Sequence, residues 1–218
     1  MKLLFLSDHH YETFGGRILA DKLGQRFDLT YWEDDYGPRL NEVDLNVFDL
    51  LVTCAIGDTP GAPHAPPEAE APVRGWLAKG VPVMLIHGGS ATFWQWDWWR
   101  ELVALRWVRG NDPDGVAPST HPIVPFQLER TKARHPLVDQ LEPLALPQDE
   151  LYIQLEETRP LQRLLETSYE GKSYPMAYVS VNQWGGPVLG YLPGHDPAVV
   201  ALEQNMANVE RMLAFLGA

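Results

Sequence analysis

The sequence predicts a doubly wound α/β domain, in which helices cover both faces of a mostly parallel β-sheet. Short apolar runs recur along the chain and lack the polar/apolar alternation of a strand with one face in water. Stretches with apolar residues at helical spacing separate these runs. Strand, helix and strand in repeated order imply right-handed crossovers, so we expect the strands to lie parallel in one sheet.

In the first half of the chain, the apolar runs expected to form buried strands are residues 3–6, 29–32, 48–53 and 81–86. Helical spacing of apolar residues predicts helices over 16–26 and 68–79, and Gly80 lies just past the second helix. Residues 58–67 are rich in Pro, Gly and Ala, which indicates a loop.

The second half of the chain has a less regular pattern. We expect a helix over 94–103, a turn-rich loop over 111–120 and a C-terminal helix over 199–216. Further apolar runs predict strands of an extension or sheet edge and one more core strand: residues 123–128, 150–154, 176–181 and 188–191. The Pro-rich loops are interpreted as connections within one domain that spans 1–218.

Composition and charge limit the classes of partner. The chain has 218 residues, of which 45% are hydrophobic, and a formal net charge of −12. This acidity disfavours nucleic acid and anionic membrane surfaces as partners. No apolar run approaches the roughly 18 residues of a transmembrane helix. The single cysteine, Cys54, is expected to be a buried, inert thiol, and with no signal-peptide pattern we expect a cytoplasmic protein.

The most distinctive segment is VPVMLIHGG, residues 81–89, a buried strand that breaks into a tight turn. A strand–turn–helix elbow usually presents a Ser or Cys nucleophile, but here His87 stands at the exposed position. Gly88 and Gly89 are expected to leave open space and free backbone N–H groups beside this imidazole.

Other histidines and carboxylates stand at the ends of predicted strands or in strongly marked turns. Because the carboxyl ends of parallel strands face one crevice, histidines from separate strands should lie near one another. Imidazole and carboxylate transfer protons near neutral pH, so we predict a catalytic set of His87, Glu150 and His195. The same groups could bind a divalent metal, but without an H-E-x-x-H or C-x-x-C motif no metal ligands are assigned.

Substrate-binding residues are expected around this catalytic set. The choice between His9 and His10 as the residue that faces the site stays open. Asp149 could instead be a turn or capping residue, and His121, which precedes a proline, is interpreted as a loop residue. The residues assigned to substrate binding are His10, Trp96, Asp149 and Tyr152.

Four of the 8 tryptophans crowd into WQWDWW, residues 94–99. On a helix Trp96 and Trp99 would share one face, and Trp94 and Trp98 another. One core cannot easily bury both faces, so we expect one pair to line the pocket, with Trp96 against a sugar ring. The number of tryptophans also favours a homo-oligomer.

Several motifs together resemble the trehalose-utilization (ThuA-like) family over nearly the whole chain. They are, in order, the His9–His10 turn, VPVMLIHGG followed by WQWDWWREL, RHPLVDQL, QDELYIQL and LGYLPGHD. The resemblance implies a flavodoxin-like, class I glutamine amidotransferase-like fold without the elbow cysteine, and a role in carbohydrate metabolism. Its motif positions correspond here to His87, 149–152 and 195–196. The turn at 185–187 departs from the family, because it lacks the expected arginine.

Three functions follow for comparison. The first is an enzyme that acts on a sugar or oxidised sugar by acid–base chemistry of His and Glu. The alternative is a non-catalytic protein that binds a sugar or other small metabolite in a degenerate amidotransferase-like pocket. A functional glutamine amidotransferase is disfavoured, because no cysteine follows the fourth predicted strand.

Overall fold

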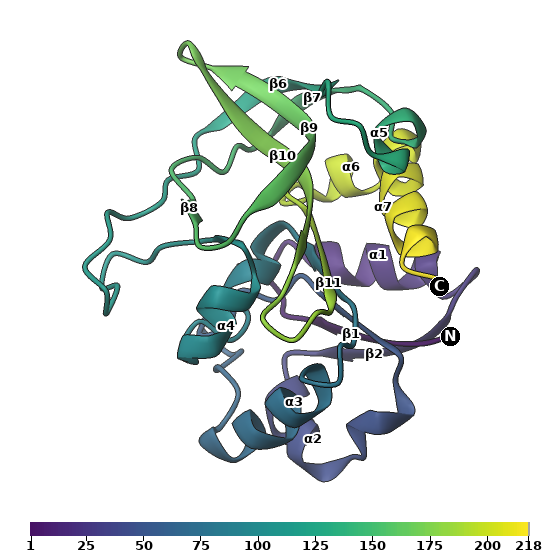
Figure 1. Cartoon of the computed structure of the whole chain (residues 1–218), viewed down its shortest axis with the longest axis vertical. Helices are drawn as coiled ribbons and strands as arrows, with labels where there is room; N and C mark the ends of the chain where they lie inside the picture. Colours follow the sequence, from purple (N-terminus) through teal and green to yellow (C-terminus); the bar gives the residue numbers. More distant parts are fainter. Residues whose placement is uncertain (218) are drawn as a thin grey trace.

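A nine-stranded sheet runs through the computed structural model, which describes residues 1–217 (Figure 1). Five strands pair in parallel, in the spatial order β2 (Asp28–Glu33), β1 (Lys2–Ser7), β3 (Leu50–Thr53), β4 (Val83–Ile86) and β11 (Pro187–Tyr191). The sheet continues through antiparallel strands β10 (Lys172–Val181), β9 (Leu161–Tyr169), β6 (Ile123–Arg130) and β7 (Leu144–Glu150). A separate short pair comprises β5 (Leu105–Arg106) and β8 (Glu156–Glu157).

Helices cover both faces of this sheet. One face carries α1 (Gly15–Leu23), α5 (Pro136–Gln140), α6 (Pro197–Val200) and α7 (Glu203–Phe215). The other face carries α2 (Tyr36–Glu42), α3 (Glu70–Leu77) and α4 (Asp97–Leu102). Three short 3-10 helices accompany them: η1 (Leu45–Val47), η2 (Pro67–Ala69) and η3 (His87–Ala91). The predicted α/β class, with a mostly parallel sheet between helices, is confirmed.

The parallel strands are apolar because both of their faces are covered. Successive side chains of a strand point to opposite sides, so Leu3 and Phe5 join one core and Leu4 and Leu6 the other. Every residue of β3 and β4 is buried. Unbroken apolar runs are the pattern expected of such strands.

Most predicted elements differ from the structure by a few residues at their ends, and three of them differ in kind. The helix predicted over 94–103 begins only at Asp97, because η3 and tight turns occupy 87–96. The strand predicted over 150–154 is replaced by β7, which ends at Glu150. The predicted C-terminal helix is divided into α6 and α7. Asp196 caps α6 by accepting a hydrogen bond from the Ala198 N–H, and Pro197 opens that helix.

The antiparallel half of the sheet returns toward the carboxyl edge of the parallel half. Glu150, the last residue of β7, pairs with Ile123 of β6. Beyond that pair, Ile153 bridges Thr120, so the segment after β7 runs beside the segment before β6. This arrangement carries two distant parts of the chain to the ends of the parallel strands.

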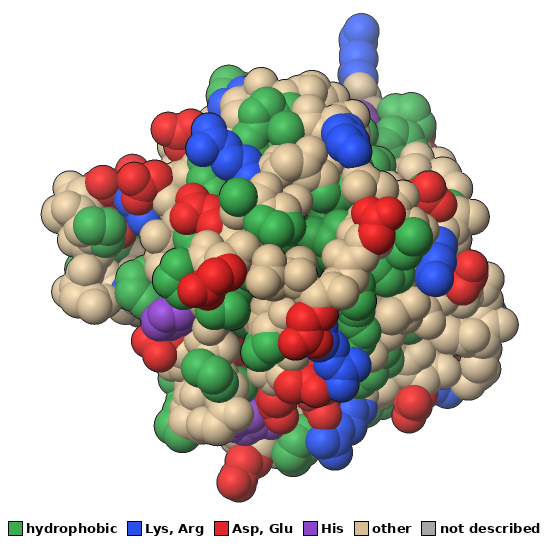
Figure 2. All heavy atoms as spheres, turned by 90° about the horizontal axis from the view of Figure 1, so that it is seen from below, with side chains coloured by type: hydrophobic (Ala, Val, Ile, Leu, Met, Phe, Trp, Pro, Cys, Tyr) green, Lys and Arg blue, Asp and Glu red, His purple; other side chains and the backbone are tan. Residues whose placement is uncertain are grey.

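The surface shows no concentration of one charge on the face seen in Figure 2, where acidic and basic side chains are interspersed. None of the described helices is long and apolar enough to cross a bilayer. None of the 8 tryptophans is exposed, so the argument from their number for a homo-oligomer loses its basis. The oligomeric state stays a prediction.

Candidate functional site

Three histidines meet at the carboxyl edge of the parallel half. His10 follows β1, His87 follows β4 and His195 follows β11. The His10 ring centroid lies 4.9 Å from that of His87 and 5.0 Å from that of His195. His9 points elsewhere, with Nδ1 3.1 Å from Oδ1 of Asp34. His10 is therefore the residue that faces the site, as its assignment required.

The turn at His87 has the form of a nucleophile elbow. His87 has φ of 46°, a left-handed conformation that is uncommon outside glycine and is typical of strained functional turns. A Cβ at Gly88 would collide with the side chain of Ile56, and one at Gly89 with the carbonyl oxygen of Thr53. The expectation of open space beside His87 is met only at Gly88, which lines a cavity described below; both glycines also stand where the turn packs closely against Thr53 and Ile56, at and beyond the end of β3.

The protonation of His87 follows from its hydrogen bond. Nδ1 lies 2.9 Å from the carbonyl oxygen of Leu192. A carbonyl only accepts, so Nδ1 carries a proton and donates it in this bond. Nε2 is buried without a hydrogen-bond partner among the described residues. The imidazole thus turns a ring nitrogen without a hydrogen bond among the described residues toward the rest of the site.

Glu150 supplies the carboxylate among these imidazoles. Its Oε2 lies 3.4 Å from Nε2 of His87 and 3.6 Å from Nδ1 of His195. Its Oε1 lies 3.1 Å from Nδ1 of His121. Burial opposes ionisation of this carboxyl, but the imidazoles, His87 foremost, outweigh burial and lower its pKa. Glu150 is therefore ionised at neutral pH.

The imidazoles of His10 and His195 are neutral at that pH. Burial, followed by the repulsion of His87 and His195, lowers the pKa of His10 well below its usual value. Burial also lowers the pKa of His195, although Glu150 acts in the opposite direction. At neutral pH the site therefore combines the ionised Glu150 with the uncharged rings of His10 and His195.

Asp149 does not contact the cavity. Its side chain is buried, and it accepts hydrogen bonds from the backbone N–H groups of Gly194, His195 and Asp196, at 2.8, 3.1 and 3.0 Å. These bonds hold the turn that presents His195. The assignment of Asp149 to substrate binding is corrected: its oxygens are occupied, and it acts as the turn-binding residue that the alternative described.

A cavity of about 110 Å³ opens beside this cluster. Tyr152 forms part of its wall, with its ring centroid 4.4 Å from that of His87 and 4.6 Å from that of Trp107. The cavity is therefore small, polar at its base and aromatic along one wall. Its lining residues are His10, Tyr11, Ile56, Gly88, Ala91, Trp107, Arg109, His121, Glu150 and Tyr152.

Trp96 lies outside this cavity, which corrects its assignment to substrate binding. It is 4% exposed and stacks on Phe93 in the core that α4 covers. Trp98 and Trp99 belong to the same core. The argument from helical spacing failed because α4 begins at Asp97, so Trp94 and Trp96 are not on the helix. The core can therefore take Trp96, Trp98 and Trp99 together.

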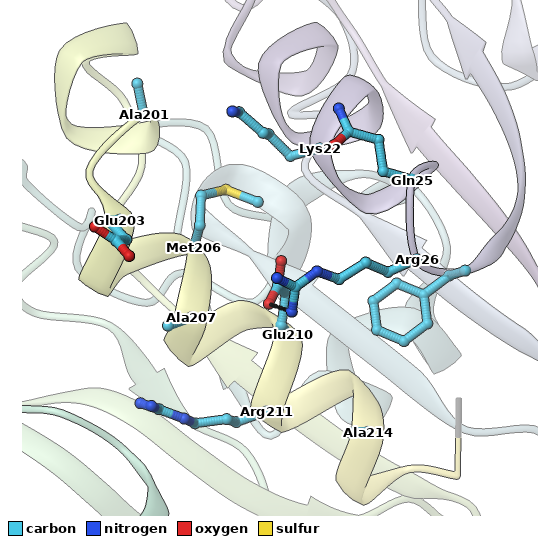
Figure 3. A pocket seen from close by; sticks show the side chains of 11 residues that line it. Lys22, Gln25, Arg26, Ala201, Glu203, Met206, Ala207, Glu210, Arg211 and Ala214 are labelled. Carbon is cyan, nitrogen blue, oxygen red and sulfur yellow. Dashed lines mark hydrogen bonds and ion pairs between the residues drawn. The ribbon is translucent and has the colours of Figure 1, made fainter.

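A larger hollow, of about 740 Å³, lies between α1 and α7 (Figure 3). Arg26 and Glu210 meet across it at 2.6 Å. None of the predicted site residues lines it. The smaller cavity is therefore the candidate site.

Sequence reasoning missed two cavity residues with clear chemical roles. His121, interpreted as a loop residue, does lie in a loop, but its ring reaches Glu150. Arg109 donates to the carbonyl oxygens of Ile56 and Gly57, at 2.7 and 3.0 Å, and brings a cation to the cavity. Both residues belong to irregular segments, where no periodic pattern marks them.

Cys54 has the inert character expected of it. It is buried at the end of β3, and burial raises the pKa of its thiol. Thiolate formation at Cys54 is therefore suppressed, and Cys54 follows β3 rather than standing on the elbow after β4.

Comparison with known proteins gives the family. The profile of the ThuA family, described as trehalose utilisation, matches residues 8–215. The chain belongs to the ThuA family. No curated protein sequence matches it.

Solved structures support the fold of this ThuA family member. It is similar to a putative ThuA-like protein from Parabacteroides merdae, with a TM-score of 0.77, 16% identity and coverage of 100% of this chain and 89% of the other. A putative ThuA-like protein from Bacteroides uniformis gives a TM-score of 0.66 and 13% identity over 99% and 90%. A putative GMP synthase component from Thermoplasma acidophilum gives 0.52 and 12% over 100% and 94%. These identities support a common fold, not a common activity.

Proposed function

We propose that this ThuA family member is an enzyme of carbohydrate metabolism that acts on a sugar or an oxidised sugar. One observation carries the proposal: the buried carboxylate of Glu150 has three imidazole nitrogens within 3.6 Å, at the base of an aromatic-walled cavity. Ionisable groups concentrated in a cleft in this way are typical of sites that move protons.

The chemistry follows from the charge states of these groups. Glu150 is an ionised acceptor, suited to take a proton from a substrate hydroxyl or from the carbon beside a carbonyl. His87 places Nε2 3.4 Å from Oε2 of Glu150, and the hydrogen bond from Nδ1 to Leu192 holds the ring in that orientation. Glu150, protonated in that step, can return the same proton to the product, either directly or through the neutral His195, whose Nδ1 lies 3.6 Å from Oε2 of Glu150.

The walls of the cavity suit a sugar. Tyr152 and Trp107 present ring faces, which pack against the C–H faces of sugars. Arg109 adds a cationic donor for a carbonyl or carboxylate oxygen. The description of the family, trehalose utilisation, agrees with this class of ligand.

The experiment is a turnover assay with purified protein on mono- and disaccharides, trehalose among them, and on their keto and acid derivatives. Products are identified by NMR and mass spectrometry. We expect turnover of at least one member, and a loss of about 10²–10⁴-fold in kcat for Glu150→Gln, because a positioned acid–base group contributes that much. Glu101→Gln, an exposed carboxylate on α4, is the matched control.

Two results would contradict the proposal. Undiminished turnover by a folded Glu150→Gln variant would show that the carboxylate does not take part. Saturable sugar binding without turnover across the panel would favour the non-catalytic alternative, a binding protein with an amidotransferase-like pocket.

A further inference from the structure

Four side chains of the site bring their donor atoms unusually close together. His10, His87, Glu150 and His195 each offer one nitrogen or oxygen, and these atoms all lie within 4.8 Å of one another. Among the described residues, this is the one such group of three or more. The four residues come from the ends of four strands, so the proximity depends on the fold rather than on a local turn.

The spacing of these donor atoms resembles that around a small cation. With bonds of about 2.0–2.1 Å, the ligands of a tetrahedral zinc ion lie about 3.3–3.4 Å apart. Oε2 of Glu150 is 3.4 Å from Nε2 of His87 and 3.6 Å from Nδ1 of His195. These separations exceed those of ordinary hydrogen bonds and suit ligands that share an ion.

Two of the nitrogens are buried acceptors or donors without a partner. Nε2 of His87 and Nδ1 of His195 have no hydrogen bond among the described residues. His87 is only 2% exposed. An unpaired buried polar atom costs about 1–3 kcal/mol, a penalty that a bound cation would remove.

The surroundings orient the rings as the outer shell of a metal site does. A ligating histidine usually donates its other ring N–H to a carbonyl or carboxylate. His87 donates from Nδ1 to the carbonyl oxygen of Leu192, which directs Nε2 at the cluster. Oδ1 of Asp8 lies 3.8 Å from Nδ1 of His10, and Asp149 holds the backbone of His195.

We propose that His10, His87, Glu150 and His195 bind one divalent transition-metal ion, such as Zn²⁺. Three imidazoles and one carboxylate are donors that zinc and its neighbours accept readily. His10 and Glu150 also line the cavity, so a ligand oxygen there has access to the ion. This inference rests on the proposed function, because it makes the ion the group that polarises a substrate carbonyl or hydroxyl.

The test uses full-length protein without a histidine tag, stripped with a chelator and titrated with Zn²⁺ and with Co²⁺. We expect one ion per chain by elemental analysis, and visible Co²⁺ bands of a site with imidazole and carboxylate ligands. His195→Ala should weaken Co²⁺ binding by more than the roughly 10–100-fold typical of losing an outer-shell partner. His195 is less buried than His87, so this variant is the safer one to fold.

The matched control is His64→Gln, because His64 is exposed and belongs to no such cluster. Its Co²⁺ affinity should equal that of the wild type. Failure of the wild type to bind stoichiometric Zn²⁺ or Co²⁺, or equal binding by folded His195→Ala and wild type, would overturn the metal site.

The two proposals fail in different ways. If metal-free protein turned over a sugar and still depended on Glu150, the role of the ion in the reaction would be contradicted and the proposed enzyme function would stand. If the protein bound one metal ion per chain but turned over no sugar, the metal site would stand and the proposed enzyme function would be contradicted.

Discussion

The two halves of the sheet contribute different chemistry to one site. The parallel half supplies the three histidines, each from a loop directly after a strand. The antiparallel half supplies Glu150 from the end of β7, and its flanking segments supply Tyr152 and His121. The parallel half therefore supplies the imidazole nitrogens, whereas the antiparallel half supplies the carboxylate and an aromatic wall.

The largest effect is expected from a double-mutant cycle that changes one site residue in each half of the sheet. We expect His87→Ala and Glu150→Gln each to lower kcat by about 10²–10⁴-fold. Together they should cost little more than either alone, because groups that act as one unit give strongly non-additive losses. The measurement is kcat on the substrate that the sugar panel identifies. Additive losses would mean that the two halves work independently.

The second challenge removes the hydrogen bonds that tie the halves together. Asp149→Asn keeps one acceptor oxygen but loses the charge that serves three backbone N–H groups on the other half. We expect a loss of about 1–3 kcal/mol in the free energy of unfolding. Denaturant unfolding measures it, with the exposed Asp139→Asn on α5 as control. An unchanged midpoint would show that the His195 turn is held by other contacts.

The smallest expected effect distinguishes the aromatic wall of the cavity from the aromatic core under α4. Trp107→Phe should raise KM by about twofold to tenfold, corresponding to the 0.5–1.5 kcal/mol of an aromatic contact, because Trp107 lines the cavity. Trp96→Phe should lower the melting temperature and leave KM unchanged, because Trp96 belongs to the core under α4. A raised KM in the Trp96 variant would return that residue to the site.

The division also explains what the sequence could predict. In a parallel sheet every strand ends at the same edge, so His87 and His195 could be placed together from strand order alone. No comparable rule fixes an antiparallel extension, whose course depends on packing and bulges. Glu150 was therefore placed from its motif, and His121 and Arg109, which lie in irregular segments, were missed. Trp96 was misplaced because its role depended on where a helix begins, the least certain feature of any sequence pattern.

Asp149 and Glu150 are neighbours in β7, yet one anchors a turn and the other meets the histidines. The register of β7 against β6 decides which of the two carboxylates takes which role. Between Val124 and Phe126 of β6 the pairing shifts, so that β7 accommodates one extra residue before Asp149. Without that irregularity, a slip by one residue would exchange the faces of the two carboxylates. A backbone bulge in the extension thus selects which acid is exposed to the cavity.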